Sequence, residues 1–202
     1  MRMARRRENL GTSPSLSLMS TTPRRVVVSE YVSLDGVMED PSWTAPYWND
    51  EIAAFKGEED SAAESLLLGR VTYEMFAAAW PTSEDPSAAR INALHKYVAS
   101  TTLRQEDLDE TGWNATLLEG DAMEAVRALR QAPGGDLLVW GSGALARALM
   151  AHGLVDEYRL IVYPVVLGSG KRLFGAETAT LDLVETRPFA TGATGLVYRP
   201  AA

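Results

Sequence analysis

The order of apolar and polar residues along the chain predicts strands and helices in alternation. Eight short apolar runs end at glycine, proline or polar residues, a pattern typical of buried strands. They cover residues 26–32, 65–68, 97–100, 115–118, 137–140, 158–166, 181–186 and 196–198. Runs of this length favour strands over helices.

Segments that favour helix separate most of these runs. Helices are expected from Asn49 or Asp50 to Lys56, over residues 72–79, as a turn at 91–95, after the capping residue Asp121, and over residues 144–152. This alternation predicts an α/β domain with a mostly parallel central sheet and helices on both faces. The last strands follow one another without helices, so the C-terminal part of the sheet is expected to be antiparallel.

The charge of the chain is divided unevenly. The 202 residues carry a formal net charge of −8. Residues 1–25 contain six arginines and one glutamate, a balance of +5, so the remainder carries −13. The N-terminal stretch is rich in Arg, Ser, Thr and Pro without apolar periodicity, so residues 1–23 are expected to be a disordered extension before a single domain at 24–202.

The composition excludes several kinds of chemistry. The chain has no cysteine, which rules out disulfides, cysteine-ligated metals and a cysteine nucleophile. His95 and His152 are its two histidines, so no metal site is expected. The acidic balance argues against binding to nucleic acid or to an anionic membrane. With no apolar window of membrane-spanning length and no export signal, the expected location is cytoplasmic.

Two strand-to-helix turns carry the clearest chemical signal. Gly69 ends one apolar strand and precedes Arg70 and a helix, while Gly141-Ser142-Gly143 ends another strand and precedes a second helix. Helix N-termini attract anions, and an arginine fork can hold a phosphate. Ligands of open α/β sheets bind at the carboxyl ends of strands, where both turns are expected. The alternative, in which the glycines only permit tight turns, stays open on this evidence.

Several motifs follow one another in a specific order. They are Ser33–Gly36, Leu67–Glu74, Lys96–Ser100, and Gly141–Gly143 with Leu154–Tyr158, Tyr163–Gly170 and Phe174. In these motifs the chain resembles the dihydrofolate reductase-like superfamily, and most closely the branch of the C-terminal reductase domain of the riboflavin-biosynthesis deaminase–reductase. The resemblance covers nearly all of residues 25–199. It implies an NADPH-dependent reductase of a small molecule, often a homodimer.

The resemblance also implies a cofactor site at the strand ends. Arg70 matches the position that meets the 2′-phosphate of the adenosine, and Ser100 and Thr101 flank the same phosphate. The residues expected to bind the cofactor are Gly69, Arg70, Thr72, Ser100, Thr101, Gly141, Ser142, Gly143, Ala144 and Leu145.

A substrate site is expected beside the nicotinamide. The resemblance places the segment from Val32 to Met38 there, and the expected substrate contacts are Ser33, Asp35, Met38 and Trp48. Asp35, Glu51 or a bound water is expected to supply the proton that follows hydride transfer. Two alternatives stay open: Asp35 as a turn residue before a glycine, and Glu51 as a residue that favours a helix N-terminus.

Two departures from the family narrow the expected substrate. The chain lacks the cysteines of the zinc deaminase domain, and its first strand begins near residue 25, which leaves no room for that domain. Trp140 stands where the riboflavin reductases usually have a glutamate before the glycine turn, which argues against their ribosylamino-pyrimidine. The expected substrate is a small planar nitrogen heterocycle or imine that resembles a pterin, a pyrimidine or a flavin precursor.

Three classes of function are compatible with these features. The first is the reductase, and the second is a nucleotide-binding protein of the same fold without turnover. The third is an interaction protein that uses the basic N-terminal extension.

Overall fold

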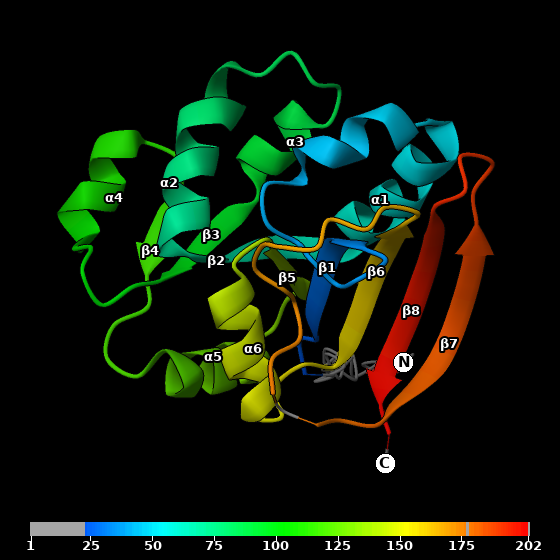
Figure 1. Ribbon diagram of the computed structural model, residues 1–202. Helices are drawn as coiled ribbons and strands as arrows, with labels where there is room; N and C mark the ends of the chain where they lie inside the picture. The colour runs from blue at the N-terminus through cyan, green and yellow to red at the C-terminus, as the bar shows by residue number, and fades with distance from the viewer. Residues whose placement is uncertain (1–22, 177, 202) are drawn as a thin grey trace, which may run out of the picture.

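A mixed sheet runs through the centre of the protein in the computed structural model, which describes residues 23–176 and 178–201 (Figure 1). Its strands are β1 (Val26–Ser33), β2 (Ala63–Gly69), β3 (His95–Ala99), β4 (Ala115–Leu117), β5 (Asp136–Trp140), β6 (Glu157–Tyr163), β7 (Leu181–Pro188) and β8 (Thr194–Pro200). Their order is β4-β3-β2-β5-β1-β6-β8-β7. The first six are parallel, whereas β8 is antiparallel to β6 and to β7, so the expected sheet is confirmed.

Helices cover both faces of this sheet, as expected. They are α1 (Asp50–Ala62), α2 (Arg70–Ala79), α3 (Ala88–Ala93), α4 (Gln105–Thr111), α5 (Ala122–Gln131) and α6 (Gly143–Ala151), with short 3-10 helices η1 (Pro41–Tyr47) and η2 (Trp80–Thr82). The alternation of side chains along β1 separates the two faces. Val26 and Val28 pack with residues of α5 and α6, whereas Val27 belongs to the cluster that includes residues of α2, α3 and α4.

Capping residues set the starts of two helices. The side chain of Asn49 accepts a hydrogen bond from the N–H of Ile52 at the start of α1, at 3.0 Å. Asp121 caps α5 by accepting from the N–H groups of Met123 and Glu124. Both N-caps agree with the preference of Asn and Asp for this position.

Several elements differ from the expectation, among them α3, which spans Ala88–Ala93 rather than residues 91–95. Helix α1 continues past Lys56 to Ala62, because its second half buries Glu59 against the sheet. Helix α4 was not expected, since Leu108 is its one buried residue and gives no apolar periodicity. Strand β6 ends at Tyr163 rather than at residue 166, because Pro164 has no N–H to continue the ladder.

Candidate active site

The two glycine turns meet at one edge of the sheet. The N–H of Gly69, at the end of β2, donates to Oγ of Ser142 at 2.9 Å. The N–H of Ser142 in turn donates to Oγ1 of Thr72 on α2, at 3.0 Å. The first turns of α2 and α6 are therefore joined by reciprocal hydrogen bonds, although 70 residues or more separate them in the sequence.

The turn after β5 has an uncommon backbone. Gly141 and Ser142 both have φ of +56°, and the left-handed region is uncommon for a residue other than glycine. The two hydrogen bonds with Gly69 and Thr72 hold Ser142 in this conformation. Among the described residues the Ser142 hydroxyl accepts from Gly69 and donates to none, so its proton can donate to a ligand.

Space around this turn also favours glycine. A Cβ added to Gly143 would lie 2.8 Å from Sδ of Met38, and one added to Gly141 would lie 3.2 Å from the side chain of Thr72. The glycines therefore let the loop after β1, the start of α2 and the start of α6 approach one another. The first residues of α2 and α6 present backbone N–H groups that a helix leaves without partners, which suits an anionic diphosphate.

Arg70, Ser100 and Thr101 lie at the same edge. Strand β3 pairs with β2 so that Ala99 is opposite Gly69, which places the residues after both strands next to each other. Arg70 forms an exposed ion pair with Glu74, one turn further along α2. Such pairs contribute only about 0.3–0.5 kcal/mol, so a phosphate can displace the carboxylate at little cost. Oγ of Ser100 accepts from the N–H groups of Thr102 and Leu103, while Thr101 is exposed.

Asp35 joins two loops at the carboxyl ends of β1 and β6. Its carboxylate accepts from the hydroxyl of Ser33 at 2.7 Å and from the N–H groups of Leu167 and Gly168 at 3.1 and 2.9 Å. These bonds lower its pKa to about 2, with the Ser33 hydroxyl as the largest cause. Asp35 is therefore ionised at neutral pH and stabilises the loop geometry.

Glu51 lies in the first turn of α1. Its carboxylate accepts from the N–H of Ala190 at 2.7 Å and from the side-chain amide of Asn49 at 3.0 Å. These bonds lower its pKa, the Ala190 N–H most of all. The two carboxyls expected as proton donors thus lie on different elements, and each is held in its charged form.

Aromatic side chains gather between α1, η1 and the ends of β1 and β6. The ring of Tyr163 is buried and meets those of Tyr31, Trp43 and Tyr47 edge to face, at centroid distances of 5.6–5.8 Å. Trp48 lies against Tyr31 and is 50% exposed. Trp48 therefore offers a flat surface near the expected substrate site, whereas Trp43 and Tyr47 pack against the core. Met38 is buried beneath the Gly143 turn.

A buried polar cluster lies under α1, and the sequence reasoning missed it. The amine of Lys56 donates to Oγ of Ser29, forms an ion pair with Glu59, and lies 4.7 Å from the ring centroid of Trp140. The indole N–H of Trp140 donates to Glu59 at 3.1 Å. Ser29 and Glu30 interrupt the otherwise apolar start of β1, and this break was the signal that could have revealed the cluster.

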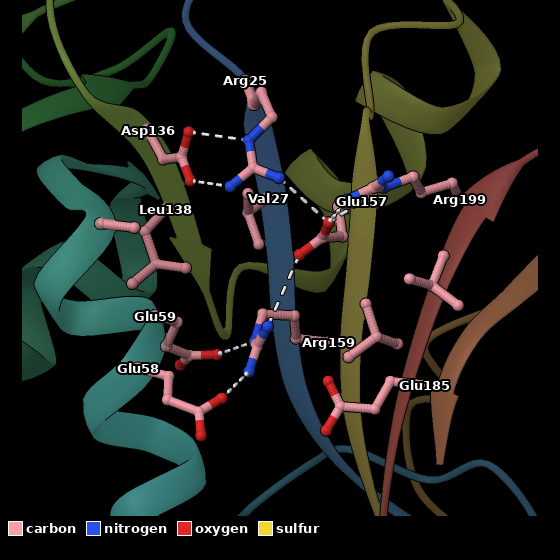
Figure 2. Close-up of a pocket in the computed structure, with 13 residues that line it drawn as sticks. Arg25, Val27, Glu58, Glu59, Asp136, Leu138, Glu157, Arg159, Glu185 and Arg199 are labelled. Atoms are coloured by element: carbon pink, nitrogen blue, oxygen red, sulfur yellow. Dashed lines mark hydrogen bonds and ion pairs between the residues drawn. The ribbon is translucent and has the colours of Figure 1, made fainter.

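A cavity of about 260 Å³ lies at the opposite, amino-terminal end of the parallel strands (Figure 2). Arginines and carboxylates alternate along its wall. Arg25 binds Asp136 through two hydrogen bonds and Glu157 through a third, and Glu157 also accepts from Arg199. These arginines and carboxylates are hydrogen-bonded to one another, so we interpret the cavity wall as an ion-pair network that stabilises the fold. The glycine turns remain the candidate active site.

The order of strands and the paired turns place the protein in the class of dihydrofolate reductase-like α/β domains. Within this class the chain belongs to the RibD C-terminal domain family, which matches residues 24–194. It is 31% identical over 186 residues to the uncharacterized protein YyaP of Bacillus subtilis, a match that covers 87% of this chain and 94% of YyaP.

Two solved structures share the fold. A putative riboflavin biosynthesis protein from Shewanella sp. PV-4 superposes with a TM-score of 0.66 at 19% identity, covering 88% of this chain and 99% of that one. Dihydrofolate reductase from Enterococcus faecalis, solved in complex with NADP(H), superposes with a TM-score of 0.59 at 14% identity and covers 88% and 97%. The expected superfamily and branch are therefore confirmed.

No helix in the described part of the chain combines the length and apolar character that a membrane span requires. The expected N-terminal extension at residues 1–23 stays a prediction, because residues 1–22 lie outside the described residues.

Proposed function

We propose that the protein is an NADPH-dependent oxidoreductase that reduces a small planar nitrogen heterocycle or imine. The observation that carries this proposal is the pair of hydrogen bonds that joins the Gly69 turn to the Gly141–Gly143 turn. They bring two helix N-termini to the carboxyl ends of adjacent strands, where a dinucleotide diphosphate would be stabilised. Membership in the RibD C-terminal domain family also supports an oxidoreductase function.

The cofactor fits the residues of this edge. NADPH would supply the hydride, and the protein would bind it and orient it towards the substrate. In this proposal Arg70, Ser100 and Thr101, which follow the ends of β2 and β3, would bind the 2′-phosphate, and the hydroxyl of Ser142 would donate to the diphosphate. The segment after β1, with Ser33 and Met38, would border the nicotinamide.

The substrate would lie between the end of β1 and Trp48. The exposed indole of Trp48 suits stacking against a flat heterocycle, and the loop fixed by Asp35 closes the far side. Asp35 and Glu51 are both held as carboxylates, so we assign the reaction proton to bulk water rather than to either side chain. The two acids then act by holding the loops in place.

Fluorescence titration with NADPH and NADH tests the cofactor assignment. We expect binding of NADPH, with quenching of tryptophan emission and a blue shift of the nicotinamide emission. Failure to bind either nucleotide at millimolar concentration would contradict the proposal. Oxidation of NADPH in the presence of pterins, flavins, imines and pyrimidines then identifies the substrate class.

The Arg70→Ala variant tests the role of the guanidinium. We expect the Kd for NADPH to rise by roughly 10- to 100-fold, because charge-assisted hydrogen bonds to phosphate contribute about 1.5–3 kcal/mol. The Kd for NADH, which lacks the 2′-phosphate, should change by less than about twofold. Arg127→Ala is the matched control, since Arg127 also forms an exposed ion pair within a helix. Equal weakening of both nucleotides in Arg70→Ala would rule out the 2′-phosphate contact.

A nucleotide-binding protein without turnover is the alternative. It predicts the same titration and the same effect of Arg70→Ala, but no substrate-dependent oxidation of NADPH. The substrate panel therefore separates the two functions.

We also propose that the protein forms a homodimer, as the family resemblance implies. The edge strand β7 leaves Leu183 and Val184 about half exposed, at 56% and 48%. Sedimentation of the wild-type chain should give the mass of a dimer, and Leu183→Glu should shift it towards the monomer. A monomeric mass for the wild type would refute this part of the proposal.

A further inference from the structure

Glu30 is a buried acid directly beneath the candidate cofactor turn. Strands β1 and β5 pair with Ser29 opposite Trp140, so the next residues along the two chains, Glu30 and Gly141, are neighbours. Glu30 shares a face of the sheet with Val28 and Val32, which pack with Leu145 of α6. Its side chain therefore lies under the start of α6, and the residue is 6% exposed.

Few polar contacts offset the loss of hydration that burial imposes on the carboxyl group of Glu30. Its Oε1 has no hydrogen-bond partner among the described residues. The N–H of Gly141 and the charge of Lys56 favour the ionised form, and the charge of Glu59 opposes it. Burial outweighs these effects and raises the pKa of Glu30 well above its ordinary range.

The other charged or titratable groups near this face are engaged or neutral. On β6, burial raises the pKa of Tyr158 to about 12, so Tyr158 is uncharged at neutral pH. Arg147 is the charged residue of α6 and donates to the carbonyl of Arg172. Arg130 of α5 is paired with Asp156. A bound anion at the turn should therefore change the protonation of Glu30 more than that of the other groups beneath the turn.

We propose that Glu30 takes up a proton from solvent when the anionic diphosphate of a dinucleotide occupies the Gly141–Gly143 turn. This inference rests on the proposed function. The N–H of Gly141 favours the carboxylate of Glu30 on one side of the turn, and the diphosphate would lie on the other side, at the N-terminus of α6. A bound diphosphate and the carboxylate of Glu30 would repel each other through this turn, because the carboxylate is buried where water screens little of its charge, and protonation of Glu30 removes the repulsion.

The linkage between proton and cofactor works in both directions. If the bound cofactor raises the pKa of Glu30, then the protonated protein binds the cofactor more tightly. Affinity should therefore be highest below the pKa of Glu30 in the free protein and should fall as the pH rises through it. Glu30 acts here as a positioning residue, since it acts through the turn rather than on the reacting atoms.

Calorimetry of the wild-type chain measures the proton directly. NADH is titrated at several pH values between 6 and 9.5, each in two buffers with different ionisation enthalpies. NADH is the probe because it has no 2′-phosphate that titrates in this range. We expect net proton uptake at some pH in this interval. Binding with no net uptake at any pH would overturn the proposal and leave the proposed function intact, whereas absence of binding would overturn the proposed function as well.

The Glu30→Gln variant assigns the proton to this residue. We expect the proton uptake of this variant on binding NADH to be at most half that of the wild type. Over the pH range in which the Kd of the wild type for NADH rises at least fivefold, the Kd of the variant should change less than twofold. Glu124→Gln, at an exposed carboxylate of α5, is the matched control and should keep the wild-type profile. A wild-type profile in Glu30→Gln would overturn the proposal. Should Glu30→Gln fail to fold, the calorimetry of the wild type still decides whether a proton is taken up.

Discussion

At the scale of residues, the residues at the carboxyl edge of the sheet mainly determine the conformation and packing of the backbone. Ser142 has a left-handed backbone that two hydrogen bonds maintain, and a Cβ on Gly143 would displace the side chain of Met38. Asp35 accepts from two backbone N–H groups of the loop after β6. In these contacts small and polar residues hold the backbone of the turns in place.

The Asp35→Asn variant tests the structural role of this carboxylate. Asp35 has a pKa of about 2 in the folded protein, below the ordinary value of 3.8, so its ionised form stabilises the fold. That contribution is complete above the unfolded-state pKa and is lost as the pH falls through the folded-state pKa. We expect Asp35→Asn to lower Tm at pH 7, with a difference from the wild type that shrinks progressively below about pH 4.

Asp50→Asn is the control for Asp35→Asn, since Asp50 is exposed in the first turn of α1. It should change Tm less at pH 7. A Tm difference for Asp35→Asn that stays constant from pH 7 to pH 2.5 would show that the hydrogen bonds do not depend on the charge.

At the scale of elements, helix α1 links the turn between β7 and β8 to the last residue of β5. Its N-terminus holds Glu51 against the turn before β8, and its second half places Lys56 and Glu59 under Trp140. A short apolar pattern predicted only the first half of this helix, because the buried residue that extends it is charged. Helix α1 thereby connects the aromatic cluster to the strand that ends in the Gly141 turn.

The Asn49→Ala variant measures how much the cap of α1 stabilises the protein. It removes the acceptor for the N–H of Ile52, and loss of such a cap costs about 1 kcal/mol in the free energy of unfolding. Urea denaturation monitored by circular dichroism gives this value. Asn49→Ser keeps an acceptor at the cap, adds no charge beside Glu51, and should stay within about 0.5 kcal/mol of the wild type. Equal losses in the two variants would show that the cap does not determine the start of α1.

At the scale of the whole molecule, the two ends of the parallel strands have different characters. The carboxyl ends have glycine turns, exposed N–H groups and Arg70. The amino ends have the ion-pair network of Figure 2, in which Glu157 joins β6 to Arg25 before β1 and to Arg199 in β8. This separation leaves the carboxyl edge free for a ligand while the opposite edge stabilises the sheet.

The Glu157→Gln variant tests the network. Glu157 is buried, and it accepts hydrogen bonds from two arginines and forms an ion pair with a third. Breaking a fully buried pair costs about 3–5 kcal/mol, but Arg25 and Arg199 are about half exposed and keep part of their hydration. We therefore expect a loss of about 2 kcal/mol in urea denaturation. Glu119→Gln, at an exposed position, should change stability by less than about 0.5 kcal/mol.

The sequence by itself determined the class of fold and the identity of the turns. Apolar runs of strand length and glycine at strand ends are local signals, and the order of motifs indicated the superfamily. Helix α4 was not predicted, because a single buried leucine produces no apolar periodicity. That residues Gln105–Thr111 form a helix is therefore evident only from the folded structure.

Only the tertiary structure decided what the polar residues do. Whether Asp35 and Glu51 are proton donors or loop anchors depends on N–H groups more than 130 residues away along the chain. The burial of Glu30 and the placement of Lys56 depend in the same way on how α1, α6 and β5 pack around β1. Protonation and hydrogen bonding respond to the local environment in space, and the sequence neighbours of a residue define only a small part of that environment.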